Sequence, residues 1–221
     1  MSLQDRLDAY KADFEANKAP PAVVAAFHKS TDELIASGQA WRALKAGDRA
    51  PSFNLADADG AMVSSAELLA KGPLVLTFYR GVWCPYCNMD LQAIEAAAAE
   101  IRALGASLAA VSLQTPPNSR KSQKDNKLSF PILSDAGGEI ADAFGLRWEV
   151  QDYLKDVFKM FGIDLAVAHG TKDWTLPMPA RYVIARDGTI AYAEVNPDYT
   201  KRPDPSGLLP TLRQLKQSAA A

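Results

Sequence analysis

Apolar residues recur at helical spacing through the first 45 positions of the chain. One apolar stripe precedes the pair Pro20–Pro21 and another follows it; their members are Leu3, Leu7, Tyr10 and Phe14, then Val24, Phe27, Leu34 and Ile35. An amphipathic helix needs a surface to cover. Residues 1–45 are therefore predicted to form a helical extension that packs on the main domain or on a second copy of the chain, as in a homodimer.

Beyond Gly47, short apolar runs alternate with amphipathic stretches. The runs predicted to be strands are residues 53–55, 61–63, 74–79, 108–113, 130–133, 182–185 and 190–193. Residues 74–79 are apolar almost throughout, which is typical of a buried central strand. The last two runs flank Arg186–Thr189, whose Asp-Gly pair is a strong hairpin signal.

Helical patterns lie between these runs, and the segment 162–179 looks like an irregular loop. The predicted helices are residues 64–69, a long segment after Cys87, a polar segment after Pro116, residues 139–144, 150–161 and 208–215. Strands that alternate with helices and then end in a hairpin favour an α/β layered sheet with helices on both faces. Residues 46–221 are predicted to be this single domain.

Composition narrows the class of protein. The chain has 221 residues, of which 48% are hydrophobic, and a net charge of -2. It carries no basic stripe suited to nucleic acid. Its apolar runs are too short to span a membrane, and its first residues lack the apolar core of a signal peptide. A cytoplasmic protein is expected.

The only two cysteines, Cys84 and Cys87, lie three residues apart between a buried strand and a long helix. A helix N-terminus stabilises a thiolate, so a Cys-x-x-Cys at this junction indicates a redox site. A reducing compartment also disfavours a purely structural disulfide. Cys84, at the start of the helix, is expected to be the more exposed and more acidic thiol, and Cys87 the shielded one.

Neighbouring residues fit this chemistry. Three-residue spacing on a helix places the two side chains on one face, close enough for the sulfurs to bond after a modest adjustment. Pro85 suits a first helical position, where its missing N–H costs nothing. Arg80 is expected to add positive charge near the thiols, and Trp83 to form an apolar wall that limits water.

Other uses of a cysteine pair are less consistent with the sequence. A zinc site needs further ligands, and only His28 and His169 are available. A c-type haem site needs histidine where Asn88 stands. Two inert core cysteines remain an alternative, because free cysteine is often buried. No metal or cofactor is expected.

Three segments resemble the peroxiredoxin-like branch of the alkyl hydroperoxide reductase and thiol-specific antioxidant family, over about residues 46–217. They are Gly47-Asp48-x-Ala50-Pro51-x-Phe53-x-Leu55, the segment from Gly72 to Cys87 with Phe78-Tyr79-Arg80-Gly81-x-Trp83-Cys84-Pro85-Tyr86-Cys87, and the segment from Leu176 to Gly188. The resemblance implies a thioredoxin-like three-layer α/β/α sandwich with a mixed central sheet. It also implies reduction of peroxides by a cysteine that becomes a sulfenic acid.

The chain departs from the usual pattern of that family. Its Pro-x-x-x-Thr-x-x-Cys motif would place the peroxide-reacting cysteine at Cys87, whereas thioredoxins attack through the position of Cys84. Pro179 stands where peroxiredoxins carry an arginine and thioredoxins a cis-proline, so we expect a cis bond there. Arg181, two residues on, is expected to point to the same side of the strand and is a candidate substitute for the missing arginine, with a surface arginine at a strand end as the alternative.

These residues favour a thiol-dependent peroxidase that reduces hydrogen peroxide or organic hydroperoxides. A sulfenic acid on one cysteine would condense with the other, and a thioredoxin-like protein or a small thiol would reduce the disulfide. The alternatives are a thiol–disulfide oxidoreductase acting on protein disulfides and a non-catalytic binding module. The insertion 146–178 is expected to shape access to the site, with Trp174 or Phe161 lining it, although core packing also suits Phe161.

Overall fold

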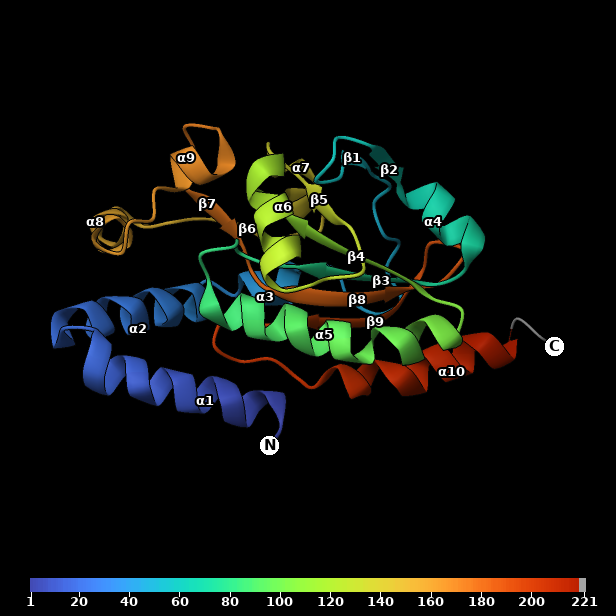
Figure 1. Ribbon diagram of the computed structural model, residues 1–221, viewed down its shortest axis with the longest axis horizontal. Coiled ribbons are helices and arrows are strands. Elements are labelled where there is room, and N and C mark those ends of the chain that lie inside the picture. The colour runs from blue at the N-terminus through green and yellow to red at the C-terminus, as the bar shows by residue number, and fades with distance from the viewer. Residues whose placement is uncertain (219–221) are drawn as a thin grey trace.

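The computed structural model describes residues 1–218, and a seven-stranded mixed sheet forms its centre (Figure 1). The strands run in the order β2-β1-β5-β4-β3-β8-β9, of which β3, β4 and β5 are mutually parallel and the others antiparallel to their neighbours. Their bounds are β1 Asn54–Ala56, β2 Met62–Ser64, β3 Leu74–Phe78, β4 Ser107–Ser112, β5 Ile132–Ser134, β8 Ala180–Ile184 and β9 Ile190–Val195. All the predicted strands of the main domain are present.

Two hydrophobic cores lie on opposite faces of this sheet. Along β3, Val75 belongs to the core on one face, while Leu74 and Leu76 belong to the core on the other, as alternation in a strand requires. Figure 1 shows α5 (Pro85–Ala103) and α10 (Leu209–Ser218) crossing the first face side by side. Short helices cover the second face: α3 (Gln39–Arg42), α4 (Ser65–Lys71) and α7 (Glu139–Ala143). The result is the predicted three-layer α/β/α sandwich.

The N-terminal extension packs on its own domain. Helix α1 (Leu3–Asp13) lies along α5, and Leu3 and Leu7 enter the same core as the cysteines. One π-helical turn, η1 (Phe14–Lys18), leads into α2 (Pro21–Ala36). In α2 the predicted stripe is partly wrong, because Val23 is buried while Ile35 is 51% exposed. A role of the extension in a homodimer stays a prediction.

The segment 146–178 is more ordered than predicted. It contains α8 (Asp152–Met160), α9 (Leu165–His169) and a two-stranded sheet of β6 (Arg147–Glu149) and β7 (Thr175–Pro177). The prediction of an irregular loop over 162–179 is therefore wrong at α9 and β7. Helix α8 packs against α2, so the insertion and the extension meet beside the start of α5. Helix α6 (Pro116–Asp125) packs beside β5.

Among residues 1–218, no helix is both long enough and apolar enough to cross a lipid bilayer.

Candidate active site

The two cysteines lie where β3 gives way to α5. Cys84 is the N-cap of α5, Pro85 is its first residue, and Cys87 lies within its first turn. Hydrogen bonds hold the preceding loop: the Val82 N–H donates to the Gln114 side chain at 3.0 Å, and the Asn88 amide donates to the Val82 carbonyl at 2.8 Å. The local geometry is the predicted one, with a thiol at the start of a helix.

Gly81 allows the loop to turn sharply against the Trp83 indole. Its φ is +151°, and a Cβ atom there would lie 2.5 Å from Nε1 of the Trp83 indole. Any side chain at this position would displace the indole or strain the backbone. The glycine therefore fixes Trp83 next to Cys84.

Both cysteines are free thiols, and both are buried: Cys84 is 1% exposed and Cys87 is fully covered. The predicted order of exposure holds only narrowly: Cys84 is the sulfur that reaches a cavity, but it is far more buried than a thiol at a helix start was expected to be. The extension and the insertion, which are remote in sequence, supply much of the cover over the helix start. The expected exposure would have held only for a thioredoxin-like domain without these additions.

The two thiols differ strongly in acidity. Burial alone would raise the pKa of Cys84, but the Cys87 thiol donates a hydrogen bond to its sulfur and Arg80 adds positive charge, so the pKa of Cys84 falls to about 6. For Cys87, burial and the neighbouring Cys84 both raise the pKa well above its usual range. Cys84 is thus the thiolate of the pair at neutral pH, which confirms the predicted order of acidity.

A cavity of about 430 Å³ gives access to Cys84, whereas Cys87 does not line it. Aromatic side chains dominate its wall and come from four parts of the chain: Tyr10, Phe14 and Phe27 from the extension, Trp83 and Tyr86 from the redox loop and α5, Phe158 and Phe161 from the insertion, and Tyr199 from the segment after β9. Phe161 is 40% exposed at the wall and is not a core residue. Trp174 packs on Phe158 and does not line the cavity.

Among residues 1–218, Arg80 is the one basic or acidic residue besides Cys84 and the tyrosines in the wall of this cavity. It is buried, and its guanidinium carbon lies 4.0 Å from the centre of the Tyr199 ring and 5.0 Å from that of Trp83. Within residues 1–218, neither its Nε nor Nε1 of Trp83 has a hydrogen-bond partner. The cavity that Cys84 lines therefore also holds a cation, the Arg80 guanidinium, against two aromatic rings.

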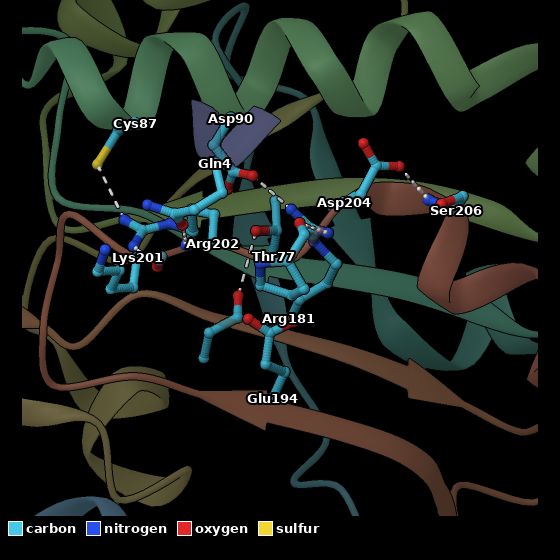
Figure 2. A network of polar contacts seen from close by, with 12 residues as sticks. Gln4, Thr77, Cys87, Asp90, Arg181, Glu194, Lys201, Arg202, Asp204 and Ser206 are labelled. Carbon is cyan, nitrogen blue, oxygen red and sulfur yellow. Dashed lines mark hydrogen bonds and ion pairs between the residues drawn. The ribbon is translucent and has the colours of Figure 1, made fainter. Parts of the chain in front are cut away.

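A buried network of charges lies behind Cys87 (Figure 2). Arg202 approaches the Cys87 sulfur, with its Nη2 atom 3.9 Å from Sγ. Asp90, one turn further along α5, pairs with Arg181 and lies 3.5 Å from Nε of Arg202. Glu194 is opposite Arg181 in the pairing of β8 with β9. This network places positive charge against the second thiol.

Arg181 and Pro179 do not have the predicted roles. The Arg181 guanidinium faces Asp90, and the positive charges that act on the two thiols come from Arg80 and Arg202. The bond before Pro179 is trans, so the predicted cis-proline is wrong. The chain there runs extended from β7 to β8, held by a 2.9 Å bond from the Met178 N–H to the Leu146 carbonyl, and needs no tight turn.

Arg202, Asp90 and Tyr199 are the site residues that the sequence did not indicate. Arg202 and Tyr199 follow β9 in an irregular segment without periodicity, and Asp90 lies on a helical face that also carries ordinary polar residues. Nothing local marks any of them, since their neighbours at the site are remote in the chain, as Cys87 is from Arg202 at a separation of 115 residues.

The two histidines lie apart from the cysteines. His28 pairs with Glu15 at 2.7 Å, and burial lowers the pKa of His169 to about 4. Over the part of the chain that the structure describes, no group of three or more His, Cys, Asp or Glu side chains could hold a metal ion.

Comparison with known proteins shows which family this chain is similar to. The model of the AhpC/TSA family matches residues 46–193. A putative peroxiredoxin of Mycobacterium tuberculosis is 32% identical over 153 residues, covering 69% of this chain and 86% of the relative. The thiol-disulfide oxidoreductase ResA of Halalkalibacterium halodurans is 34% identical over 104 residues, or 47% of this chain, which spans only 58% of that relative.

Solved structures agree on the fold. The peroxidoxin BcpB of Mycobacterium tuberculosis superposes with a TM-score of 0.61 and 23% identity, over 77% of this chain and 97% of that one. The family model begins at residue 46, so the N-terminal extension lies outside it.

Proposed function

The chain belongs to the AhpC/TSA family, and we propose that it is a thiol-dependent peroxidase, an antioxidant oxidoreductase that acts through Cys84 and Cys87. One observation carries this proposal: Cys84 combines a pKa lowered to about 6 with a place at the inner end of a cavity. A thiolate is the nucleophile that peroxides require.

The first step transfers one oxygen atom to Cys84. The thiolate attacks the nearer oxygen of hydrogen peroxide or an organic hydroperoxide, so that an S–O bond forms and the O–O bond breaks. Sulfur is oxidised by two electrons to a sulfenic acid, and the departing oxygen takes up a proton to leave as water or an alcohol. Arg80 lines the cavity and stabilises the negative charge that develops on this oxygen.

The second step joins the two cysteines. Oxidation removes the negative charge from Cys84, which is one of the reasons that the pKa of Cys87 is high. Arg202 and Arg80 then favour the Cys87 thiolate, which attacks the Cys84 sulfur. The S–S bond forms as the S–O bond breaks, and the departing hydroxide takes up the proton that Cys87 released and leaves as water. Cys84 is thus the thiolate before oxidation, and Cys87 becomes the thiolate after it.

Family membership implies a peroxide as the oxidising substrate and a thioredoxin-like protein or a small thiol as the reductant. The cytoplasm is the compartment that fits best, because two free thiols persist there between turnovers.

A direct test uses the reduced protein and one equivalent of hydrogen peroxide or cumene hydroperoxide. We expect stoichiometric loss of peroxide and a mass decrease of about 2 Da, as an intramolecular disulfide forms. With excess thiol present, peroxide consumption should become catalytic. A protein whose thiols persist under this treatment would contradict the proposal.

The alternative, reduction of protein disulfides, is favoured by the similarity to ResA and by the position of Cys84 at the helix start. An insulin-reduction assay separates the two functions. We expect little turnover, because Cys84 is 1% exposed and a protein disulfide cannot reach it. Insulin reduction faster than peroxide reduction would favour the alternative.

The pH dependence of the peroxide reaction should follow the ionisation of Cys84. Because its pKa is lowered to about 6 and the thiolate is the reactive form, the rate should rise as the pH increases through about 6 and level off above it. Replacing Arg80 with methionine removes positive charge at similar length. The midpoint should then move to higher pH, with a roughly fivefold loss of rate at pH 6 for the first pH unit of movement, because Cys84 is half ionised there in the wild-type protein.

Stopped-flow fluorescence of the tryptophans, of which Trp83 adjoins Cys84, measures this profile. Arg213→Met is the matched control, because Arg213 is an exposed arginine paired with Glu100 far from the cavity. An Arg80→Met profile with an unchanged midpoint would show that Arg80 does not set the acidity of Cys84.

A further inference from the structure

The cover over Cys84 comes from segments that a bare thioredoxin-like domain lacks. Phe14 of η1, Phe27 of α2 and Phe161 after α8 form a triangle of rings, with centroids between 5.8 and 6.3 Å apart. All three line the cavity that leads to Cys84. The extension and the insertion therefore close over the sulfur from two sides.

This cover restricts what can reduce a disulfide between Cys84 and Cys87. In thiol–disulfide exchange the attacking sulfur must come within bonding distance of the sulfur that it attacks, about 2 Å in the product. A cysteine on the surface of a folded protein cannot enter a cavity of about 430 Å³. A small molecule fits such a volume well.

A second cavity of about 240 Å³ adjoins the first and shares Phe14, Phe27, Tyr86 and Tyr199 with it. Its remaining wall carries charges of both signs: Lys11, Glu15, His28, Asp32 and Asp198. The first cavity is aromatic, and among residues 1–218 Arg80 is the one Lys, Arg, His, Asp or Glu in its wall. A molecule that spans both would place an uncharged, reactive end in the first cavity, beside Cys84, and both an ammonium and a carboxylate group in the second.

We propose that the reductant of this protein is a low-molecular-weight zwitterionic thiol, about the size of a short peptide, and not a protein dithiol. This inference rests on the proposed function, in which each turnover leaves the pair as a disulfide. The thiolate of the small reductant attacks Sγ of Cys84, the sulfur that lines the cavity, and the disulfide bond between Cys84 and Cys87 breaks. Cys87 leaves as a thiolate beside Arg202. A second molecule of the thiol attacks the mixed disulfide, frees Cys84 and leaves as the oxidised dimer, so that two thiols supply the two electrons.

The test begins with protein oxidised by diamide, so that the reduction step is measured without any peroxide. Glutathione serves as the zwitterionic probe, and a reduced thioredoxin serves as the protein dithiol. At equal thiol concentration we expect glutathione to reduce the wild-type protein at least as fast as thioredoxin does. Reduction by thioredoxin more than tenfold faster than by glutathione would overturn the inference, while leaving the peroxidase proposal intact.

Two further measurements on the wild-type protein sharpen this result. A polyethylene glycol thiol of about 5 kDa should react at least tenfold more slowly than 2-mercaptoethanol at equal thiolate concentration, because it does not fit the cavity. Glutathione should exceed 2-mercaptoethanol at least threefold at equal thiolate concentration. Equal rates for the large and small thiols would refute the size limit, and equal rates for glutathione and 2-mercaptoethanol would refute the requirement for charge.

Opening the cover should admit the protein reductant. Replacing Phe14 and Phe161 together by alanine should raise the rate with thioredoxin at least tenfold and change the rate with 2-mercaptoethanol less than threefold. Met160→Ala is the matched control, because Met160 is 67% exposed, adjoins Phe161 and lines neither cavity. A folded double variant that thioredoxin still reduces at the wild-type rate would refute the role of the cover.

Discussion

Replacing Cys84 with serine is expected to lower the rate constant for peroxide reduction by about a thousandfold or more. A serine hydroxyl does not ionise near neutral pH, so the nucleophile is lost. Cys87 cannot substitute for it, because burial raises its pKa and it does not line the cavity. Single-turnover peroxide consumption, followed with a peroxide-sensitive dye, measures the effect.

The Cys87→Ser variant separates the two roles. It should retain one fast turnover with peroxide and then hold a sulfenic acid at Cys84, which dimedone labels and mass spectrometry locates. Its initial rate should fall modestly, because the hydrogen bond that Cys87 donates to the Cys84 sulfur weakens or changes. It should form no intramolecular disulfide.

The opposite pattern, with peroxide reactivity lost in Cys87→Ser and retained in Cys84→Ser, would assign the attack to Cys87. That is the assignment that the usual peroxiredoxin motif gives by position. The structure supports Cys84 as the attacking thiolate, because Cys84 is the N-cap of α5 and the positive charge of Arg80 lowers its pKa. Cys87 lies one turn further in and has the opposite shift of its pKa.

The sequence could predict the redox turn because all its determinants are local. The apolar run of β3, the proline after Cys84 and the amphipathic pattern of α5 lie within thirty residues and dictate the strand, the turn and the helix in succession. Arg80 and Trp83 were identified for the same reason. The seven strands also follow from local patterns, including the β8–β9 hairpin.

The exposure of Cys84 and the role of Arg202 could not be predicted in this way. Both depend on contacts between segments far apart in the chain, such as Tyr10 against Tyr86, with ring centroids 5.2 Å apart. The apolar stripe of α1 indicated that the helix covers something, but not that it covers the active site. The prediction of a cis bond before Pro179 is wrong for a different reason: it relied on a motif shared with thioredoxins, and this chain does not adopt the backbone geometry of that motif.

The buried charge network should make Asp90 essential for stability. We expect Asp90→Asn to lower the free energy of unfolding by about 3–5 kcal/mol, because removing one partner of a buried ion pair leaves charge uncompensated. Here two guanidinium groups, those of Arg181 and Arg202, lose the same carboxylate, and all three side chains are at most 5% exposed. Urea unfolding of the reduced protein, followed by circular dichroism, measures the change.

Asp59→Asn is the matched control, since Asp59 pairs with Arg120 at 3.1 Å on the surface and should matter little. Glu194 is a second carboxylate beside Arg181, but burial raises the pKa of Glu194 above its usual value, so it is less readily ionised than an ordinary glutamate. If Asp90→Asn and Asp59→Asn unfolded at the same urea concentration, Glu194 would have to carry the charge balance. Asp90 also orients Arg202, which lies beside the Cys87 sulfur. A destabilised but folded Asp90→Asn protein should therefore form its disulfide more slowly after oxidation of Cys84. The rate of disulfide formation thus distinguishes a role of Asp90 in positioning from a role in stability alone.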